Sequence, residues 1–262
     1  MNGKQVRLNR ILEKGKAVIV PMDHGVSSGP LAGLDDMDGL VKMVTAGGAS
    51  SVVLHKGMVK QITPPTCGVI MHLSASTMLG PDPNRKSIIA SVDEAILLGC
   101  DAVSIHVNVG GCDSENEMLA SLGEVSDDCD AAQMPLLAMM YPRGKNVPAA
   151  YSPDAIALVA RVAAELGADI VKCPYTGTVE SFRNVVRGCP VPVVIAGGQC
   201  MNSDRAVLEL VAGAMEAGGA GASIGRNIFQ HPSPERMTAA LRAVIIGGAA
   251  PGDAMRLLTG GK

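Results

Sequence analysis

The chain has 262 residues, of which 47% are apolar and 2% aromatic, and its formal net charge is −3. The small charge and the scatter of acidic and basic residues argue against binding to nucleic acid or to an anionic membrane surface. No apolar stretch reaches the roughly 18 residues of a membrane-spanning helix, and the basic N-terminal segment lacks the apolar core of a signal peptide.

Short apolar runs alternate with helical stretches along the whole chain. We predict strands at residues 17–22, 50–55, 68–73, 101–107, 135–140, 169–173, 191–196 and 220–224. Helices are predicted between them, for example at 87–98, 114–132, 153–166 and 204–217. This alternation, in a chain of this length, predicts an α/β fold of the (β/α)8 TIM-barrel type, with one domain over residues 1–262. An open doubly wound sheet is the alternative, and it is disfavoured because no GxGxxG motif follows the first strand.

The two ends of the chain lie outside the predicted barrel. We expect the segment before residue 17 to fold across the bottom of the barrel. Residues 247–262 are rich in glycine and contain a short helical stretch. They cover either an edge of the barrel or a neighbouring subunit.

The seven cysteines are odd in number, and no two of them form a CxxC motif. A disulfide framework or a zinc site of cysteines is therefore not expected. We interpret them as small core residues of a protein in the reducing cytoplasm.

Functional side chains of a TIM barrel lie at the C-terminal ends of the strands and in the loops that follow. The sequence places these candidates there: Asp23, His24, His55, Lys56, His72, His106, Asn108, Tyr141, Arg143, Lys172, Tyr175, Gly197, Gly198, Gly225 and Arg226.

Lys172 is the most informative candidate, because it follows the apolar residues of the sixth predicted strand. A lysine there can point into the mouth of the barrel. Partial loss of hydration favours its neutral amine, which can attack a carbonyl and form a Schiff base. The alternative is a lysine that pairs with a carboxylate at the rim of the barrel.

Asp23 and Tyr141 follow the first and fifth predicted strands. The carboxylate of Asp23 can take a proton from a substrate, or it can hold Lys172 as an ion pair. The phenol of Tyr141 can donate a proton to a carbinolamine or to a developing alkoxide. Otherwise it is a core ring with a satisfied hydroxyl group.

A phosphate site is predicted after the last two strands, where this fold commonly binds phosphate. Gly197 and Gly198 follow the seventh strand, and Gly225 and Arg226 follow the eighth. Glycine amides can approach an anion closely, and the arginine adds a charged donor. Tight turns with an arginine in a rim ion pair are the alternative.

Three histidines near strand ends, His24, His72 and His106, could together hold a catalytic zinc ion. We place this reading below the lysine mechanism, so that no metal or other cofactor is expected. Lys56 is a second lysine at a strand end, and we assign it to the rim or to substrate binding.

Longer motifs connect these residues to a known family. They are VIVPMDHGVSSGP, VLHKG, DAVSIHVNVG, AMMYPRGK, ELGADIVK followed two residues later by YTG, CPVPVVIAGG and GRNIFQH. With these motifs the chain resembles, over nearly its whole length, the archaeal-type class I aldolases of the DeoC/FbaB family. The resemblance implies a TIM barrel that forms a homo-oligomer, often a decamer of two pentameric rings.

The resemblance also implies roles for single residues. Lys172 matches the Schiff-base lysine, Asp23 the proton acceptor and Tyr141 the proton donor. The implied substrate-binding residues are Asp23, His24, Gly25, Val26, Ser27, Tyr141, Pro142, Arg143, Gly197, Gly198, Gly225 and Arg226.

The implied reaction transfers a three-carbon unit from a phosphorylated ketose to L-aspartate semialdehyde, in the synthesis of aromatic amino acids through 3-dehydroquinate. One alternative condenses dihydroxyacetone phosphate with aspartate semialdehyde, toward 3-amino-4-hydroxybenzoate. Another is a class I fructose-bisphosphate aldolase. A non-catalytic sugar-phosphate sensor is the rival from another class of protein. The expected partners are therefore small phosphorylated sugars and aldehydes, without nucleic acid or membrane.

Overall fold

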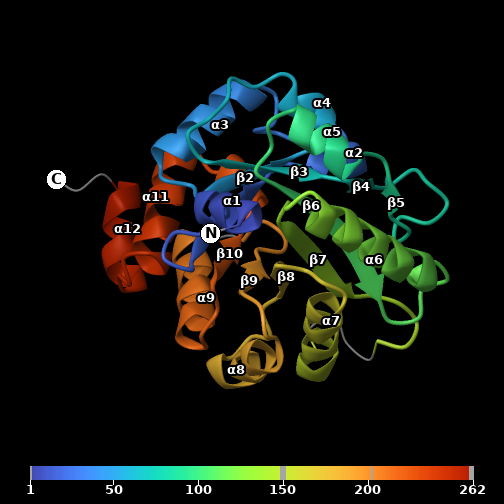
Figure 1. Cartoon of the computed structure of the whole chain (residues 1–262). Coiled ribbons are helices and arrows are strands. Elements are labelled where there is room, and N and C mark those ends of the chain that lie inside the picture. Colours follow the sequence, from blue (N-terminus) through green and yellow to red (C-terminus); the bar gives the residue numbers. More distant parts are fainter. Residues whose placement is uncertain (1, 148–151, 202, 260–262) are drawn as a thin grey trace.

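The computed structural model describes residues 2–147, 152–201 and 203–259, which form a closed barrel of parallel strands (Figure 1). The barrel strands are β1 (Ala17–Pro21), β2 (Ser51–Leu54), β3 (Gly68–His72), β6 (Ala102–Val109), β7 (Leu136–Pro142), β8 (Ile170–Pro174), β9 (Val193–Ala196) and β10 (Gly221–Ser223). Their order around the barrel is β1-β10-β9-β8-β7-β6-β3-β2, and β2 closes on β1. The predicted (β/α)8 fold is therefore confirmed.

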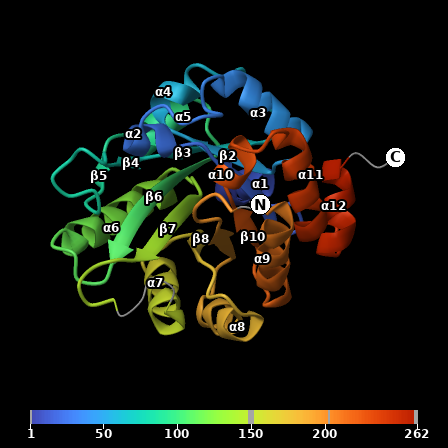
Figure 2. The ribbon, with the colours of Figure 1, turned by 180° about the vertical axis from the view of Figure 1, so that it is seen from behind.

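Helices surround the barrel. The larger ones are α3 (Met37–Ala46), α5 (Val92–Leu97), α6 (Glu115–Ala131), α7 (Pro153–Glu165), α8 (Val179–Gly188), α9 (Asp204–Glu216) and α11 (Pro234–Ile245). Short helices follow three strands: α2 (His24–Ser28), α4 (Lys56–Val59) and α10 (Arg226–Phe229). Figure 2 shows the barrel from behind, with α2 and α10 on that side.

The interior of the barrel is a separate apolar cluster. It consists of Ile11, Ala17, Ile19, Val53, Ile70, Ala102, Leu137, Met139, Ile170 and Val194. Its members on one strand are two residues apart, as alternation along a strand requires. The next inward position toward the C-terminal end is Lys172 on β8, Tyr141 on β7 and His72 on β3. Strand register thus sets which side chains reach the mouth.

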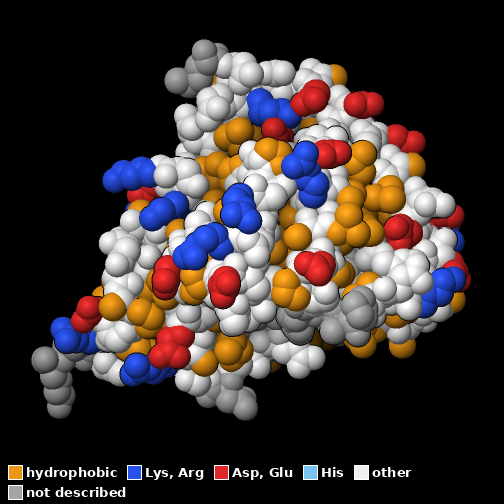
Figure 3. Space-filling model, turned by 90° about the horizontal axis from the view of Figure 1, so that it is seen from below, with side chains coloured by type: hydrophobic (Ala, Val, Ile, Leu, Met, Phe, Trp, Pro, Cys, Tyr) orange, Lys and Arg blue, Asp and Glu red, His pale blue; other side chains and the backbone are white. Residues whose placement is uncertain are grey.

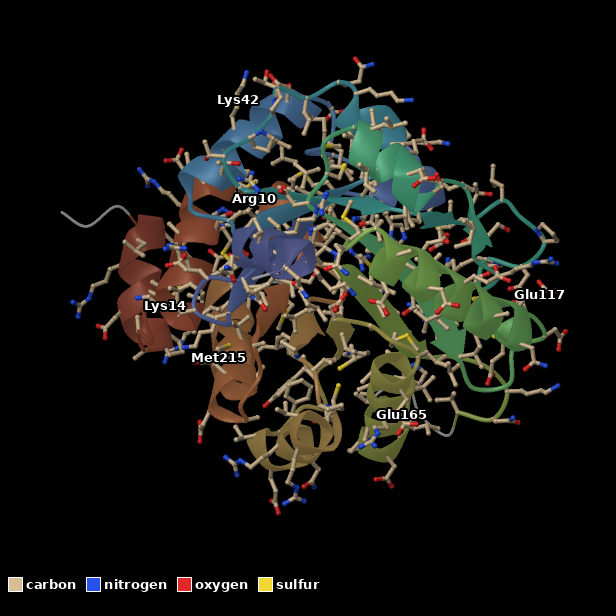
Figure 4. All side chains as sticks on the ribbon, viewed as in Figure 1. Arg10, Lys14, Lys42, Glu117, Glu165 and Met215 are labelled. Carbon is tan, nitrogen blue, oxygen red and sulfur yellow. The ribbon has the colours of Figure 1, made fainter. Side chains whose placement is uncertain are left out.

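The first helix, α1 (Gly3–Ile11), lies across the N-terminal end of the barrel, as the sequence led us to expect (Figure 1). Ile11 is fully buried in the interior cluster. A Cβ atom on Gly68 of β3 would lie 2.9 Å from the carbonyl oxygen of Arg10, so the close approach of α1 requires glycine there. Arg10, labelled in Figure 4, also pairs with Asp101 at the start of β6.

The segment after β3 differs from the prediction. We predicted a helix over residues 87–98, but Ser87 and Ile88 form β5 (Ser87–Ile88), which pairs antiparallel with β4 (Ser74–Ala75). The helix α5 begins at Val92, because the hydroxyl group of Ser91 accepts a hydrogen bond from the amide of Glu94 at 3.1 Å. Because the helix begins only at Val92, the segment between β4 and β5 is not helical and reaches the mouth of the barrel.

The last described helix, α12 (Pro251–Thr259), packs against α9 and α11 outside the barrel. It covers the helices rather than an edge of the barrel. Among the described helices, none is both long and apolar enough to cross a membrane.

The outer surface mixes charged and apolar side chains, as the face in Figure 3 shows. Lys42, Glu117 and Glu165, labelled in Figure 4, each take part in an ion pair at the surface, with Asp38, Arg85 and Arg161 respectively. Exposed pairs of this kind contribute little to stability. The fold therefore rests on its two apolar clusters.

Candidate active site

Two adjoining cavities, each of about 350 Å³, open at the C-terminal ends of the strands. Both are lined by His24, Tyr141, Arg143, Lys172 and Arg226. The structure therefore brings together side chains from within β7 and β8 and from the segments that follow β1, β7 and β10, as the sequence predicted for a barrel mouth.

Lys172 lies in the middle of β8, paired with Met139 of β7 and Val194 of β9. Only 6% of the residue is exposed. Its Nζ atom is 4.0 Å from the sulfur atom of Met139, and within the described residues it forms no ion pair shorter than 4.0 Å. Because it lacks a close carboxylate, the rim ion pair that we considered as the alternative is not formed.

Asp23 follows β1 and faces two histidines. Its carboxylate oxygens lie 3.6 Å from Nδ1 of His24 and 3.8 Å from Nε2 of His72. Burial opposes the ionisation of Asp23, but the positive charges that His72 and His24 take up in acid, together with Lys172, outweigh it and hold the pKa of the carboxyl group well below its usual range.

His72 is the neutral neighbour of this carboxylate. Burial lowers the pKa of His72 to about 4, although Asp23 acts in the opposite direction. Its Nδ1 atom lies 2.8 Å from the hydroxyl group of Ser104. At neutral pH the site thus holds an ionised Asp23 beside an uncharged imidazole, which suits a proton acceptor.

Tyr141 contacts two other side chains at the mouth. Its ring lies 4.8 Å from the ring of His106, and the guanidinium carbon of Arg143 is 4.7 Å from the centre of the tyrosine ring. The ring is thus held by two neighbours, and Tyr141 lines the same cavities as Lys172.

The glycine turns after β9 and β10 meet at one side of the mouth. Gly198 has φ of 66°, a left-handed conformation that favours glycine. Arg226 donates a hydrogen bond to the carbonyl oxygen of Gly198 at 2.7 Å. In the described structure, Nε of Arg226 and the hydroxyl group of Ser223 are buried without a partner. Free donors beside two glycine turns suit an anionic ligand.

The remaining sequence candidates divide into two groups. Pro142, Gly197 and Gly225 line one cavity and Ser27 lines the other. Gly25 and Val26 line neither and are exposed, so they do not contact this space. Lys56 pairs with Glu94 at 3.1 Å, which gives it a place at the rim.

The three histidines do not form a cluster that would suit zinc. Within residues 2–147, 152–201 and 203–259, no group of three or more potential ligands is arranged to hold a metal ion. His106 instead lies 2.9 Å from the side-chain oxygen of Asn108.

Lys86 and Ser223 line the cavities, and the sequence analysis missed both. Lys86 directly precedes the helix that we predicted over residues 87–98, and that helix in fact begins at Val92. The rule that strand–helix loops build the site could have found it, since Lys86 follows β3. Ser223 ends β10 two residues before Gly225, and the alternation of that strand was the available signal.

Comparison with known proteins places the chain in a family. Residues 17–231 match the DeoC/LacD family aldolases. The chain is 42% identical over 257 residues to 2-amino-3,7-dideoxy-D-threo-hept-6-ulosonate synthase of Halobacterium salinarum. This match covers 97% of this chain and 95% of that protein. The chain is 38% identical over 256 residues to 2-amino-4,5-dihydroxy-6-oxo-7-(phosphonooxy)heptanoate synthase of Streptomyces griseus, with 96% and 93% covered.

A solved structure gives the same result. It is an archaeal fructose-1,6-bisphosphate aldolase whose catalytic lysine is covalently bound to the carbinolamine intermediate of the substrate. The TM-score is 0.87 at 29% identity, and the match covers 93% of this chain and 99% of that one. The chain therefore belongs to the DeoC/LacD family of aldolases and is a class I aldolase, the class that works through a lysine Schiff base.

Proposed function

We propose that the protein is a transaldolase of the 2-amino-3,7-dideoxy-D-threo-hept-6-ulosonate synthase type, with Lys172 as its nucleophile. The carrying observation is that one barrel mouth holds Lys172, Asp23, Tyr141 and Arg226 together. The donor is 6-deoxy-5-ketofructose 1-phosphate and the acceptor is L-aspartate semialdehyde. The product leads through 3-dehydroquinate to the aromatic amino acids.

The reaction begins when the amine of Lys172 attacks the ketone carbon of the donor and forms a carbinolamine. Loss of water gives a protonated imine. The bond between the α and β carbons of this imine then breaks, and its electron pair moves into the imine. The rest of the donor leaves as an aldehyde formed from the β-hydroxyl carbon, and an enamine remains on the lysine. The enamine attacks the aldehyde carbon of the acceptor, and water hydrolyses the new imine to free the product and Lys172.

Asp23 and Tyr141 move the protons of this sequence. Asp23 takes the proton of the donor hydroxyl group as the C–C bond breaks, and its low pKa keeps it ionised for that task. Tyr141 donates a proton to the oxygen that leaves the carbinolamine. Arg226 and the turns at Gly197–Gly198 and Gly225 bind the phosphate group of the donor.

The rival reaction has the same mechanism, but in it the phosphate group stays on the fragment that is transferred. The name of the Streptomyces griseus relative describes a product with a phosphonooxy group on carbon 7, whereas the Halobacterium salinarum name describes a 7-deoxy product. The two reactions therefore differ in whether the transferred fragment carries phosphate. The mass of the product formed from each donor with aspartate semialdehyde separates them, and cleavage of fructose 1,6-bisphosphate tests the third candidate.

Sodium borohydride provides the direct test of the nucleophile. Incubation with a phosphorylated ketose and borohydride should add the mass of the reduced donor fragment to the intact protein, and peptide mapping should place it on Lys172. An adduct on another lysine would overturn the assignment. Failure of every donor to form an adduct or a product, on folded protein, would favour the sugar-phosphate sensor.

The variant Lys172→Met should lower turnover by more than about a thousandfold, because no other group supplies the electron sink. Donor binding, measured by calorimetry, should persist, since Arg226 and the glycine turns are unchanged. Lys145→Met, which alters an exposed lysine outside the two cavities, is the control and should retain full activity. Near-normal activity of Lys172→Met would end the Schiff-base account.

We further propose that the protein works as a cytoplasmic homo-oligomer. The seven free cysteines support a reducing compartment. Sedimentation of the purified protein would measure the assembly state.

A further inference from the structure

The mouth of the barrel is strongly cationic in a chain whose net charge is −3. The cavity that contains Asp23 is lined by Lys86, Arg143, Lys172 and Arg226, against Asp23 as its one acidic side chain. Within the described residues, neither Lys86, Arg143 nor Arg226 has a carboxylate within 4.0 Å. The proposed mechanism uses Lys172, and the donor phosphate uses Arg226, so two cations are left over.

The two remaining cations both line the cavity that contains Asp23. Lys86 lines the cavity with Asp23 but not the cavity formed by Gly197, Gly198 and Gly225. Arg143 lies close enough to Lys86 that, after burial itself, its charge is the next cause that lowers the pKa of Lys86. Arg143, Lys172 and Arg226 line both cavities, so that Lys86 is the one of these four cations that lines only the cavity away from the glycine turns.

The position of Lys86 is fixed by the hairpin segment that carries it. Its ammonium group donates hydrogen bonds to the hydroxyl group of Ser76 and to the carbonyl oxygen of Pro83. The neighbouring Asn84 accepts a hydrogen bond at 2.7 Å from the side chain of Asn108, a fully buried residue of β6. The segment is therefore anchored to the barrel wall, which holds the lysine at the mouth.

The same network reaches Arg143. Because the amide nitrogen of Asn108 donates to Asn84, its oxygen accepts, so Nε2 of His106 carries the proton between them at 2.9 Å. The ring of His106 lies against Tyr141, over which Arg143 is stacked. Both cations are thus set by one continuous set of contacts that begins at Asn108.

We propose that Lys86 and Arg143 form the binding site for the carboxylate of the acceptor aldehyde. This inference rests on the proposed function, which makes the acceptor an amino acid aldehyde. An ammonium group has three donors, and two of those of Lys86 are used within the hairpin. The remaining donor and the guanidinium group suit a carboxylate better than a phosphate with its three oxygens.

The test uses acceptors that differ by one group. Lys86→Met should raise the KM for L-aspartate semialdehyde and for succinic semialdehyde by about 10- to 100-fold, the effect of losing a charged hydrogen bond. The KM for 3-aminopropanal, which lacks the carboxylate, should not change, nor should that for the donor. Lys86→Arg should restore much of the lost affinity, and Lys145→Met is the matched control.

Binding of L-homoserine separates this inference from the proposed function, because this alcohol has the same carboxylate and cannot react. Calorimetry should show that Lys86→Met weakens homoserine binding by a similar factor, while the borohydride adduct of the donor on Lys172 is unchanged. Equal losses with 3-aminopropanal, a raised KM for the donor, or absence of homoserine binding to the unmodified protein would overturn the carboxylate site. Absence of the donor adduct alone would overturn the proposed function.

Discussion

Arg226 joins two tasks in one side chain. It donates to the carbonyl oxygen of Gly198, which orders the turn after β9, while its Nε atom is buried and unpartnered in the described structure. A buried donor without a partner is costly unless a ligand satisfies it. This explains why an arginine, rather than a lysine, suits the position: its guanidinium group can hold the turn and bind an anion at once.

The variant Arg226→Ala should therefore raise the KM for the phosphorylated donor by about 10- to 100-fold, with a smaller change in kcat. Steady-state kinetics with the donor varied at saturating acceptor measures this effect. Arg205→Ala is the control, because Arg205 is an exposed residue of α9 that pairs with Glu209. An unchanged KM for the donor would move the phosphate site elsewhere.

For single residues, the sequence predicted the position of a side chain correctly where alternation along a strand alone decides which way that side chain points. Lys172 lies within β8, Tyr141 lies near the end of β7 and Asp23 follows β1, so correctly predicted strands were enough to place them. It failed for Lys86, whose position depends on a hairpin of two-residue strands and on a hydrogen bond from Asn108. Such contacts between distant segments leave no periodic pattern in the sequence.

The strands themselves depend on small residues at the bottom of the barrel. Gly221 begins β10 with φ of 137°, and a Cβ atom there would lie 2.0 Å from the carbonyl oxygen of Ala17 on β1. These two strands close the barrel on the side next to the phosphate turn. The glycine therefore lets β1 and β10 pair, and their C-terminal ends carry Asp23 and Arg226.

The variant Gly221→Ala should lower the free energy of unfolding by at least about 2 kcal/mol, because the clash involves backbone atoms that cannot move aside. Urea unfolding followed by circular dichroism measures the change. Gly123→Ala is the control: Gly123 lies in α6 with nothing within 4 Å of an added Cβ atom. That variant should be neutral or stabilising by up to about 1 kcal/mol, and equal losses in both variants would contradict the argument.

The boundaries of helices and strands were likewise predictable where a local sequence pattern decides them, and not where other contacts do. The eight strands were predictable because buried parallel strands are continuous apolar runs. The start of α5 was not, since the apolar residues Ile88 and Ile89 continue the helical pattern backwards from Val92. The turn that ends the hairpin and the cap at Ser91 decide that boundary.

At the scale of the whole molecule, the buried histidines of the site make the folded protein less stable in acid. Four histidines, His24, His55, His72 and His106, surround the mouth, and burial lowers the pKa of each below its ordinary value. Each remains uncharged in the folded protein at pH values where the unfolded chain already binds a proton. Folding therefore becomes less favourable as the pH falls through the unfolded pKa of about 6.5.

The sign and size of this effect are clearest for His72. Its folded pKa of about 4 lies below the unfolded value, so the unfolded state binds more protons between these two values. Stability should then rise with pH across that window, and His72 alone should contribute a loss of about 2 kcal/mol between pH 7 and pH 5. Asp23 acts at lower pH, because its contribution is complete above the unfolded pKa of about 3.9 and is lost progressively as the pH falls from there to the depressed folded pKa.

Urea unfolding of the protein and of His72→Gln at pH 7, 6 and 5 measures this contribution. The variant is expected to be less stable at pH 7, because the contact with Ser104 is lost, yet its stability should fall less steeply between pH 7 and pH 5. The difference in slope, rather than the difference in stability at one pH, identifies the buried imidazole as the cause. Parallel curves for the two proteins would show that His72 is protonated equally in the folded and unfolded states, and the neutral imidazole beside Asp23 would have to be abandoned.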